Sequence, residues 1–282
     1  MSDSARISPT AHYTGYVWAR AGLSHPELVT REGRVLFESV RPAMIASGLL
    51  GGARLEPYLL TRHRAIDVLL EQAIDSGGVS QVLEIACGLS PRGWRFAQRY
   101  GARITYVEAD LPGMAKRKRA ALERMGTLGP AHRVEVVDAL SDESFAALVS
   151  TLEPARGLAI VTEGLTGYLT PEQLEGLWGR CARTLGAFSA GRYLSDLHVG
   201  EEQPPQVRAF RVVLSAFVRG TVHLHYGTRA QAHDALRRAG FATATVHPAG
   251  ALAPETRGPG AELVSIVEAS TASRAGAQRE SE

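Results

Sequence analysis

The stretch from Val82 to Asp110, VLEIACGLSPRGWRFAQRYGARITYVEAD, constrains the fold of this chain more than any other segment. It starts with a short apolar run, broken by Gly88, that is typical of a buried strand. Ser90 can cap a helix, and Pro91 suits the first helical position, where its missing N–H costs nothing. A second strand is expected from Arg103 to Val107. Strand, turn, helix and strand in this order predict a parallel sheet whose ligand lies beyond the carboxyl ends of its strands.

Acidic side chains occur where such a ligand would bind. Glu84 lies in the first predicted strand, and Glu108 and Asp110 follow the second. A dinucleotide site needs G-x-G-x-x-G, but only Gly88 occupies a position of that fingerprint, and Glu84 would repel a pyrophosphate. S-Adenosylmethionine has no phosphate. Its sulfonium and ammonium groups favour a nearby acid, and an acid after the second strand can bind ribose hydroxyls, so the acids favour this cofactor.

Two further predicted strands also end in acids. Residues 133 to 137 lead to Asp138, and residues 157 to 162 lead to Glu163. The acids recur at intervals of roughly 25 residues, the length of one strand, helix and connection. A single acid after a strand is usually a turn former or a helix cap. Four acids in register instead predict a polar, cation-tolerant edge of the sheet.

Helical patterns separate these strands. Apolar residues recur at helical spacing from Leu55 to Ile74. A Ser or Thr followed three residues later by Glu or Gln forms a capping box, and this spacing predicts helix starts at Ser24, Thr170 and Thr228. The basic cluster at residues 116 to 119 is expected to be a solvated helix face, because it is short and has no interleaved aromatic residues.

Three segments resemble the leucine carboxyl methyltransferase superfamily: EIACGLSPR, YVEADLPGMA with a lysine three residues on, and VTEGLTGYLTPEQ. Within it they are most similar to the tetracenomycin-type polyketide carboxyl O-methyltransferases, and in this order they cover most of residues 10 to 250. The resemblance implies an α/β, Rossmann-like class I methyltransferase fold, with a seven-stranded, mostly parallel sheet and helices on both faces. The last two strands are expected at residues 241 to 247 and 262 to 268, the final one antiparallel.

The resemblance also implies roles for single residues around S-adenosylmethionine, which leaves as S-adenosylhomocysteine. An arginine of the helix at residues 55 to 74, Arg62 or else Arg64, would bind the methionine carboxylate. Asp138 and Ala139 would contact adenine, and Glu163 would lie near the sulfonium and the ammonium. A solvated helix face remains the alternative for either arginine.

The length of 282 residues suits one large domain with appendages. Residues 79 to 270 are expected to form the methyltransferase domain, with a substrate insert at about 199 to 227. Residues 1 to 78 would form a helical cap or lid. The polar residues 271 to 282 are expected to be disordered.

Two tyrosines and a tryptophan gather between His12 and Gly22, before the sheet begins. We expect this segment to fold over the cofactor as a lid, because so early in the chain it has little core of its own to join. Residues 1 to 11, which precede it, are expected to be disordered.

The methyl acceptor has to be aligned with the donor and shielded from water, and no particular protein nucleophile is required. A carboxylate acceptor is already ionised at pH 7, whereas a phenol with a pKa of about 10 would benefit from a base. A fifth strand is expected at residues 187 to 194, and His198 follows it at the carboxyl edge. His198, Tyr193 and Tyr16 are therefore the preferred catalytic residues. Further candidate positioners are Tyr13, His223, His225 and Tyr226, and all seven have core or solvated positions as alternatives.

Charge and cysteine content limit the partners. The 31 basic and 29 acidic residues leave a formal net charge of +2, too small to favour nucleic acid. Cys87 and Cys181 form neither a disulfide framework nor a zinc motif, and no metal-ligand spacing is present. No apolar run approaches about 18 residues, so neither a signal peptide nor a membrane span is expected. The sequence predicts a cytoplasmic enzyme with a small-molecule substrate and no metal, and it leaves the oligomeric state open.

Three functions are consistent with these features. The favoured one is a small-molecule O-methyltransferase acting on a carboxylic acid or a phenolic natural product. The second is a protein carboxyl methyltransferase that acts on the C-terminus of a partner. The third is a non-catalytic module that binds an adenosyl ligand.

Overall fold

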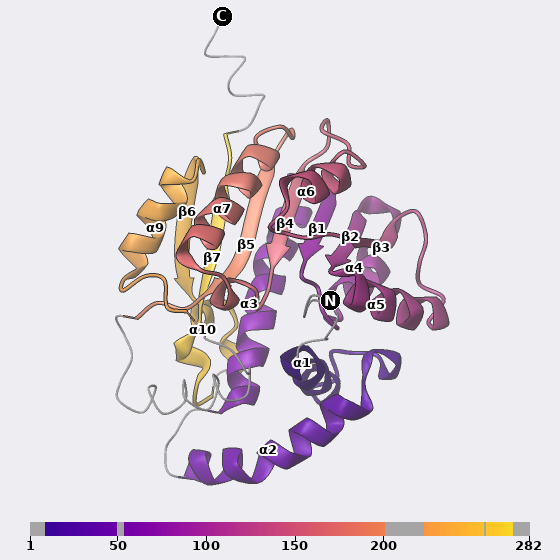
Figure 1. Cartoon of the computed structure of the whole chain (residues 1–282), viewed down its shortest axis with the longest axis vertical. Coiled ribbons are helices and arrows are strands. Elements are labelled where there is room, and N and C mark those ends of the chain that lie inside the picture. The colour runs from indigo at the N-terminus through magenta and orange to yellow at the C-terminus, as the bar shows by residue number, and fades with distance from the viewer. Residues whose placement is uncertain (1–8, 50–53, 201–222, 257, 273–282) are drawn as a thin grey trace, which may run out of the picture.

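A seven-stranded sheet forms the centre of the molecule (Figure 1). The computed structural model describes residues 9–49, 54–200, 223–256 and 258–272. The strand order is β3-β2-β1-β4-β5-β7-β6. The strands are β1 (Gln81–Ile85), β2 (Thr105–Asp110), β3 (His132–Val136), β4 (Leu158–Thr162), β5 (Gly191–Leu197), β6 (Thr243–Pro248) and β7 (Ser265–Ser270).

Only β7 runs against the other strands of this sheet. It pairs antiparallel with both β5 and β6, whereas β1 to β5 are joined by parallel ladders. The expected α/β, mostly parallel architecture with an antiparallel last strand is confirmed. Parallel neighbours need crossover connections, which here are helices that bury both faces of the sheet.

Helices cover the sheet in two layers. Successive strand residues face opposite layers, so Val82 joins the apolar cluster beneath α3 and Leu83 joins the cluster beneath α7. The first layer contains α3 (Leu55–Asp75), α4 (Arg92–Tyr100), α5 (Pro112–Arg124) and α10 (Ala249–Leu252). The second contains α6 (Asp142–Val149), α7 (Pro171–Leu185) and α9 (Arg229–Arg238), which lie in front of the sheet in Figure 1.

Two helices precede this core, α1 (Pro9–Arg20) and α2 (Arg31–Leu49). The capping box expected at Ser24 is wrong, because α2 begins at Arg31 after Thr30, whose hydroxyl accepts from the Gly33 N–H at 3.0 Å. Residues 9–11 are helical rather than disordered, and residues 1–8 lie outside the described ranges.

The aromatic segment of α1 does have a core to join, which corrects the reason given for a lid. Tyr13 and Trp18 are 2% and 5% exposed. Tyr13 packs on Phe37 of α2, and the Trp18 ring lies 4.7 Å from the ring of His63 in α3. Helix α1 also passes close to the turn after β1, where a Cβ added to Gly88 would lie 3.7 Å from the Ala11 Cβ.

Several other boundaries differ from the expected ones. The fifth strand begins at Gly191, four residues after the predicted start, and continues to Leu197, three residues past the predicted end. Ser195 and Asp196 near its end are polar yet buried. Helix α4 starts at Arg92, so Pro91 is the N-cap and not the first helical residue. The capping boxes at Thr170 and Thr228 are confirmed.

Most of the proposed insert, residues 201–222, and of the tail, residues 273–282, falls outside the described residues. At the margins of the insert, Val199 and Tyr226 form an isolated parallel bridge. Within the described ranges, no helix is long and apolar enough to cross a bilayer.

Candidate functional site

The turn after β1 has an unusual backbone conformation. Ala86 and Gly88 have φ angles of 54° and 52°, in the left-handed region that a residue with a Cβ seldom adopts. The Gly88 N–H donates to Asp110 Oδ2 at 2.8 Å, and the Leu111 N–H donates to Oδ1 at 2.7 Å. Burial raises the pKa of the Asp110 carboxyl. The end of β2 therefore fixes the turn, and a strained backbone of this kind is common at ligand sites.

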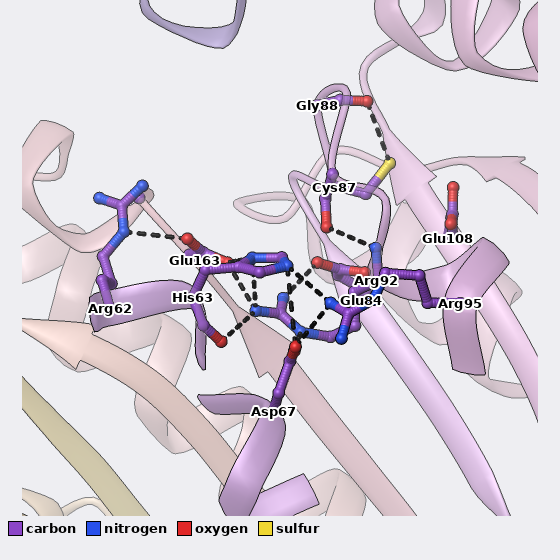
Figure 2. A network of polar contacts seen from close by, with 12 residues as sticks. Arg62, His63, Asp67, Glu84, Cys87, Gly88, Arg92, Arg95, Glu108 and Glu163 are labelled. Carbon is purple, nitrogen blue, oxygen red and sulfur yellow. Dashed lines mark hydrogen bonds and ion pairs between the residues drawn. The ribbon is translucent and has the colours of Figure 1, made fainter. Parts of the chain in front are cut away.

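Arg92 is the centre of a buried polar network beside this turn (Figure 2). It donates to Asp67 at 2.7 Å, to Glu84 at 2.6 Å and to Glu163 at 2.7 Å, joining α3, β1 and the end of β4. Sequence reasoning missed Arg92, because an arginine that follows Ser-Pro in a helix start looks like an exposed residue. Its only signal was its place in the EIACGLSPR segment.

Glu84 belongs to this network and is 1% exposed. Arg92 donates to Oε1 and the Tyr106 hydroxyl donates to Oε2 at 2.7 Å. Both carboxylate oxygens thus have protein partners. These contacts let Glu84 orient Arg92 from β1.

Glu163 lies where α3, α4 and β4 meet. Its Oε1 accepts from Arg62 Nε at 3.0 Å, and its Oε2 lies 2.8 Å from His63 Nδ1. Burial opposes ionisation, but His63, Arg92 and Arg62 hold the pKa of the Glu163 carboxyl well below its usual value. Glu163 therefore carries a fixed negative charge at neutral pH.

Arg62, rather than Arg64, enters the site. Arg62 is 7% exposed and donates to Asp196 Oδ2 at 3.3 Å as well as to Glu163. A Cβ on Gly164, whose φ is +70°, would lie 3.2 to 3.5 Å from the Arg62 guanidinium. Arg64 instead lies 3.7 Å from both Asp67 and Glu255 and is one-third exposed.

The network pairs its buried carboxylates with an equal number of guanidiniums. Its four buried carboxylates are Asp67, Glu84, Glu163 and Asp196, and the guanidiniums within ion-pair distance of them are Arg62, Arg64, Arg92 and Arg95. His63 also contacts the network, with its Nδ1 2.8 Å from Glu163 Oε2. A buried carboxylate such as that of Glu163 favours a cationic ligand group and disfavours a phosphate. The carboxylates of the network therefore fit a sulfonium or ammonium group.

Glu108 forms a second buried cluster beneath the first. It lies inside β2, which extends to Asp110, and its carboxylate is 2.8 Å from Lys118 Nζ and 3.4 Å from His132 Nε2. A Cβ on Gly93 would lie 1.7 Å from Glu108 Oε1, so α4 approaches β2 closely only because this residue is glycine. The structure places Glu108 among these partners rather than at the rim.

Lys118 corrects the prediction that residues 116 to 119 are a solvated face. It is fully buried and also donates to the Ser90 carbonyl, in the loop that follows the left-handed turn. Lys116 and Arg117 are exposed, as expected. Lys118 is the lysine of the YVEADLPGMA segment, and its buried role was not recognised.

Asp138 and Ala139 follow β3 next to the end of β2, where the Val137 N–H donates to the Asp110 carbonyl at 3.0 Å. Asp138 is exposed, and its Oδ1 accepts from the Leu140 N–H at 2.9 Å. The structure brings Asp110, Asp138 and the Gly88 turn to one edge of the sheet, as the acid series predicted.

His198 lies at the end of β5 and contacts Tyr58 of α3. Tyr58 Oη and His198 Nε2 are 2.8 Å apart, and the two rings stack with centroids 5.7 Å apart. Burial raises the pKa of the Tyr58 phenol. Tyr58 is one turn of α3 before Arg62, so His198 lies next to the network. Sequence reasoning missed Tyr58, which resembled any apolar helix residue.

The other acceptor candidates are dispersed. Tyr193 is fully buried, and its hydroxyl pairs with Thr162 at 2.8 Å and accepts from Trp178 at 3.2 Å, which is a core position. Tyr16 packs edge-on against Phe37. Of the rest, Tyr13 lies in the cap, His225 Nε2 is 3.0 Å from the Thr166 carbonyl, His223 stacks on His225, and Tyr226 stacks on Trp178.

Metal ligands do not cluster within the described part of the chain, where no group of three or more His, Cys, Asp or Glu side chains could hold an ion. Cys87 and Cys181 are both buried free thiols, and burial raises the pKa of each.

Comparison with known proteins places this geometry in context. The sequence pattern of the family described as leucine carboxyl methyltransferase matches residues 37–182. A protein of Mycolicibacterium paratuberculosis described as an S-adenosyl-L-methionine-dependent methyltransferase is 33% identical over 128 residues, 45% of this chain and 40% of that protein. A protein of Mycobacterium sp. (strain KMS) with the same description is 33% identical over 151 residues, 53% and 48% of the two chains. The matches thus span less than half of each relative.

Solved structures share the fold. A methyltransferase structure from Thermobifida fusca YX superposes with a TM-score of 0.67 at 14% identity, covering 95% of this chain and 96% of that one. Human N-acetylserotonin methyltransferase in complex with SAM gives a TM-score of 0.52 at 12% identity, covering 92% and 66%. These likenesses identify the seven-stranded sheet and its helices as a class I methyltransferase fold.

Proposed function

Because this chain belongs to the leucine carboxyl methyltransferase family, we propose that it is an S-adenosylmethionine-dependent O-methyltransferase of small molecules. The observation that carries the proposal is the buried network around Glu163. It lies at the carboxyl edge of a class I sheet and holds the buried carboxylate of Glu163 beside a left-handed turn. That combination suits a cationic adenosyl ligand.

Different residues at this edge would bind different parts of the cofactor. The turn at Gly88 and the carboxylate of Asp110 would hold the ribose, and Asp138 with Ala139 would contact adenine. Arg62 would bind the methionine carboxylate, and Glu163 would neutralise the cationic groups. When bound, S-adenosylmethionine supplies an electrophilic methyl group on sulfur.

The chain then has to position the acceptor. An acceptor oxygen would have to lie in line with the methyl group and its sulfur, and this alignment is what the chain has to supply. His198 orients a carboxylate or removes the proton of a phenol, and α1 excludes water above the Gly88 turn. The carboxylate is the favoured acceptor, on the resemblance to polyketide carboxyl methyltransferases.

Cofactor binding is tested first, with Gly88 as the probe. Calorimetry should show S-adenosylhomocysteine binding in the micromolar range and no binding of NAD. Gly88→Val should abolish this binding, because valine is strained at a φ of 52° and its side chain would enter the space of the ligand. Gly129→Val is the control, since Gly129 has open space and an ordinary φ. Binding of NAD in place of S-adenosylhomocysteine would contradict the proposal.

His198→Ala tests the acceptor chemistry. For a phenol, turnover should fall roughly 10²- to 10⁴-fold, as for a lost general base, and the loss should shrink as rising pH ionises the phenol unaided. For a carboxylate, a smaller effect confined mostly to KM is expected. His233→Ala, a half-exposed histidine on α9, is the control. Wild-type kinetics of His198→Ala from pH 6 to 9 would remove His198 from the mechanism.

S-Adenosylmethionine with a labelled methyl group distinguishes the proposed function from the two alternatives. Incubation with metabolite extract should place the label in small molecules, whereas a protein carboxyl methyltransferase would label proteins of a whole lysate. A non-catalytic adenosyl-binding module would bind S-adenosylhomocysteine and label neither.

A further inference from the structure

A pocket of about 150 Å³ lies between α1, α2 and the first turn of α3. Tyr13, Phe37, Met44 and Leu55 form its apolar wall. An apolar cavity of about this size holds one benzene ring. We call this space the cap pocket.

The charged part of its lining is unbalanced. Arg20, Arg41 and Arg54 line the pocket together with one carboxylate, Glu56. Glu56 is 3.7 Å from Arg20 Nε and 3.5 Å from Arg54 Nη2, long distances for a hydrogen bond. Among the described residues, the buried Nε of Arg54 has no hydrogen-bond partner. The Arg41 pair with Glu38 is on the exposed surface. Arg20 also lies over the Phe37 ring, 4.7 Å from its centroid. The pocket therefore offers an anion three arginines against one carboxylate in its lining, and one buried donor, Arg54 Nε, that has no partner among the described residues.

One face of α3 runs from the cap pocket towards the proposed methyl-transfer site. Leu55, Tyr58 and Arg62 are spaced by three and four residues, so they lie on the same side of the helix. Leu55 lines the pocket, Tyr58 contacts His198, and Arg62 contacts Glu163. The rise from the first to the last of these is about 10 Å.

We propose that the cap pocket binds an anionic aromatic ring and is the distal end of the acceptor site. The acceptor is then an elongated aromatic acid: one oxygen lies beside His198, and a second anionic group lies among the arginines. This assignment rests on the proposed function. If the assignment holds, cationic acceptors and uncharged acceptors are not substrates.

Nuclear magnetic resonance titration of the full chain, saturated with S-adenosylhomocysteine, tests the pocket with benzoate and benzamide. The two rings have nearly the same shape and differ in charge. Benzoate should bind in the millimolar range and benzamide at least about 10-fold more weakly, because the neutral amide cannot form a charge-assisted hydrogen bond of carboxylate strength with the arginines. Equal binding of the two probes would overturn the assignment.

Arg54→Gln should weaken benzoate binding about 10-fold, and Arg41→Gln serves as the second variant where the first does not fold. Arg124→Gln is the control, because it makes the same charge change at an exposed arginine paired with Glu27. Wild-type affinity in the pocket variants would overturn the proposal.

The link to the acceptor site has its own measurement. Biphenyl-4,4′-dicarboxylate should bind about 10-fold more tightly than biphenyl-4-carboxylate, and Arg54→Gln should remove that difference. If benzoate binds in the pocket but the second carboxylate adds no affinity, the pocket is not the end of the acceptor site. Failure of S-adenosylhomocysteine to bind the same samples would instead contradict the proposed function.

Discussion

Replacing Arg92 with methionine is expected to lower the free energy of unfolding by at least about 3–5 kcal/mol, the range for removing one partner of a buried ion pair. Arg92 is 0% exposed, and its loss would leave the carboxylates of Asp67, Glu84 and Glu163 short of a partner. Since small domains are stable by about 5–15 kcal/mol, a large part of the total would be lost. S-Adenosylhomocysteine binding should be lost as well.

Urea denaturation followed by circular dichroism measures this loss. Arg99→Met is the matched control on the same helix. Arg99 is 53% exposed and pairs with Glu71, so its removal should cost no more than about 1 kcal/mol. Arg92→Lys should recover only part of the stability, because a lysine cannot reproduce the forked contacts of a guanidinium. An unfolding midpoint of Arg92→Met equal to that of Arg99→Met would show that the network does not hold the site together.

Lys118→Met should give the second large effect, again about 3–5 kcal/mol, because it leaves the buried Glu108 carboxylate with only the His132 ring, 3.4 Å away, as an ion-pair partner among the described residues. Lys116→Met, at an exposed position of the same helix, should change stability by less than about 0.5 kcal/mol. The double variant Lys118→Met with Glu108→Gln should recover much of the loss, since it removes the uncompensated charge.

The pH dependence identifies the cause of this loss. Burial alone would raise the pKa of the Glu108 carboxyl, but Lys118 and His132 lower it below its usual value. Its contribution is therefore present above the unfolded pKa and decreases as the pH falls through the folded value. In Lys118→Met the desolvated carboxyl should instead bind a proton more readily, so the deficit should shrink on acidification. A deficit that is constant between pH 7 and pH 5 would point to lost packing rather than to an unpaired charge.

The sequence predicted the sheet well because each element has a local signal. Short apolar runs located the first four strands to within a few residues, and Thr170 and Thr228 marked helix starts through their capping boxes. Ser24 has the same spacing but does not cap α2, because Thr30 does so closer to the helix. Spacing alone cannot choose between two nearby caps.

The site was predicted only as a set of acids at one edge. Which acid faces the ligand depends on partners far away in the chain, such as Arg92 with Asp67 or Lys118 with Glu108. The ends of β2 and β5 could not be predicted from apolar runs either. Asp196 is polar yet buried within β5, and Glu108 is polar yet buried within β2. A buried charge looks like a surface charge until its counter-charge is located.

The missing side chain of Gly93 couples two positions that lie fifteen residues apart in the sequence. Since the Glu108 carboxylate occupies the space where a Cβ of residue 93 would be, neither position can change freely while the other stays as it is. A relative with alanine or a larger residue in place of Gly93 has to carry a shorter side chain in place of Glu108, or else move α4 away from β2. The two positions should therefore vary together among related chains. Where a relative has an uncharged residue in place of Glu108, it should also have an uncharged residue in place of Lys118.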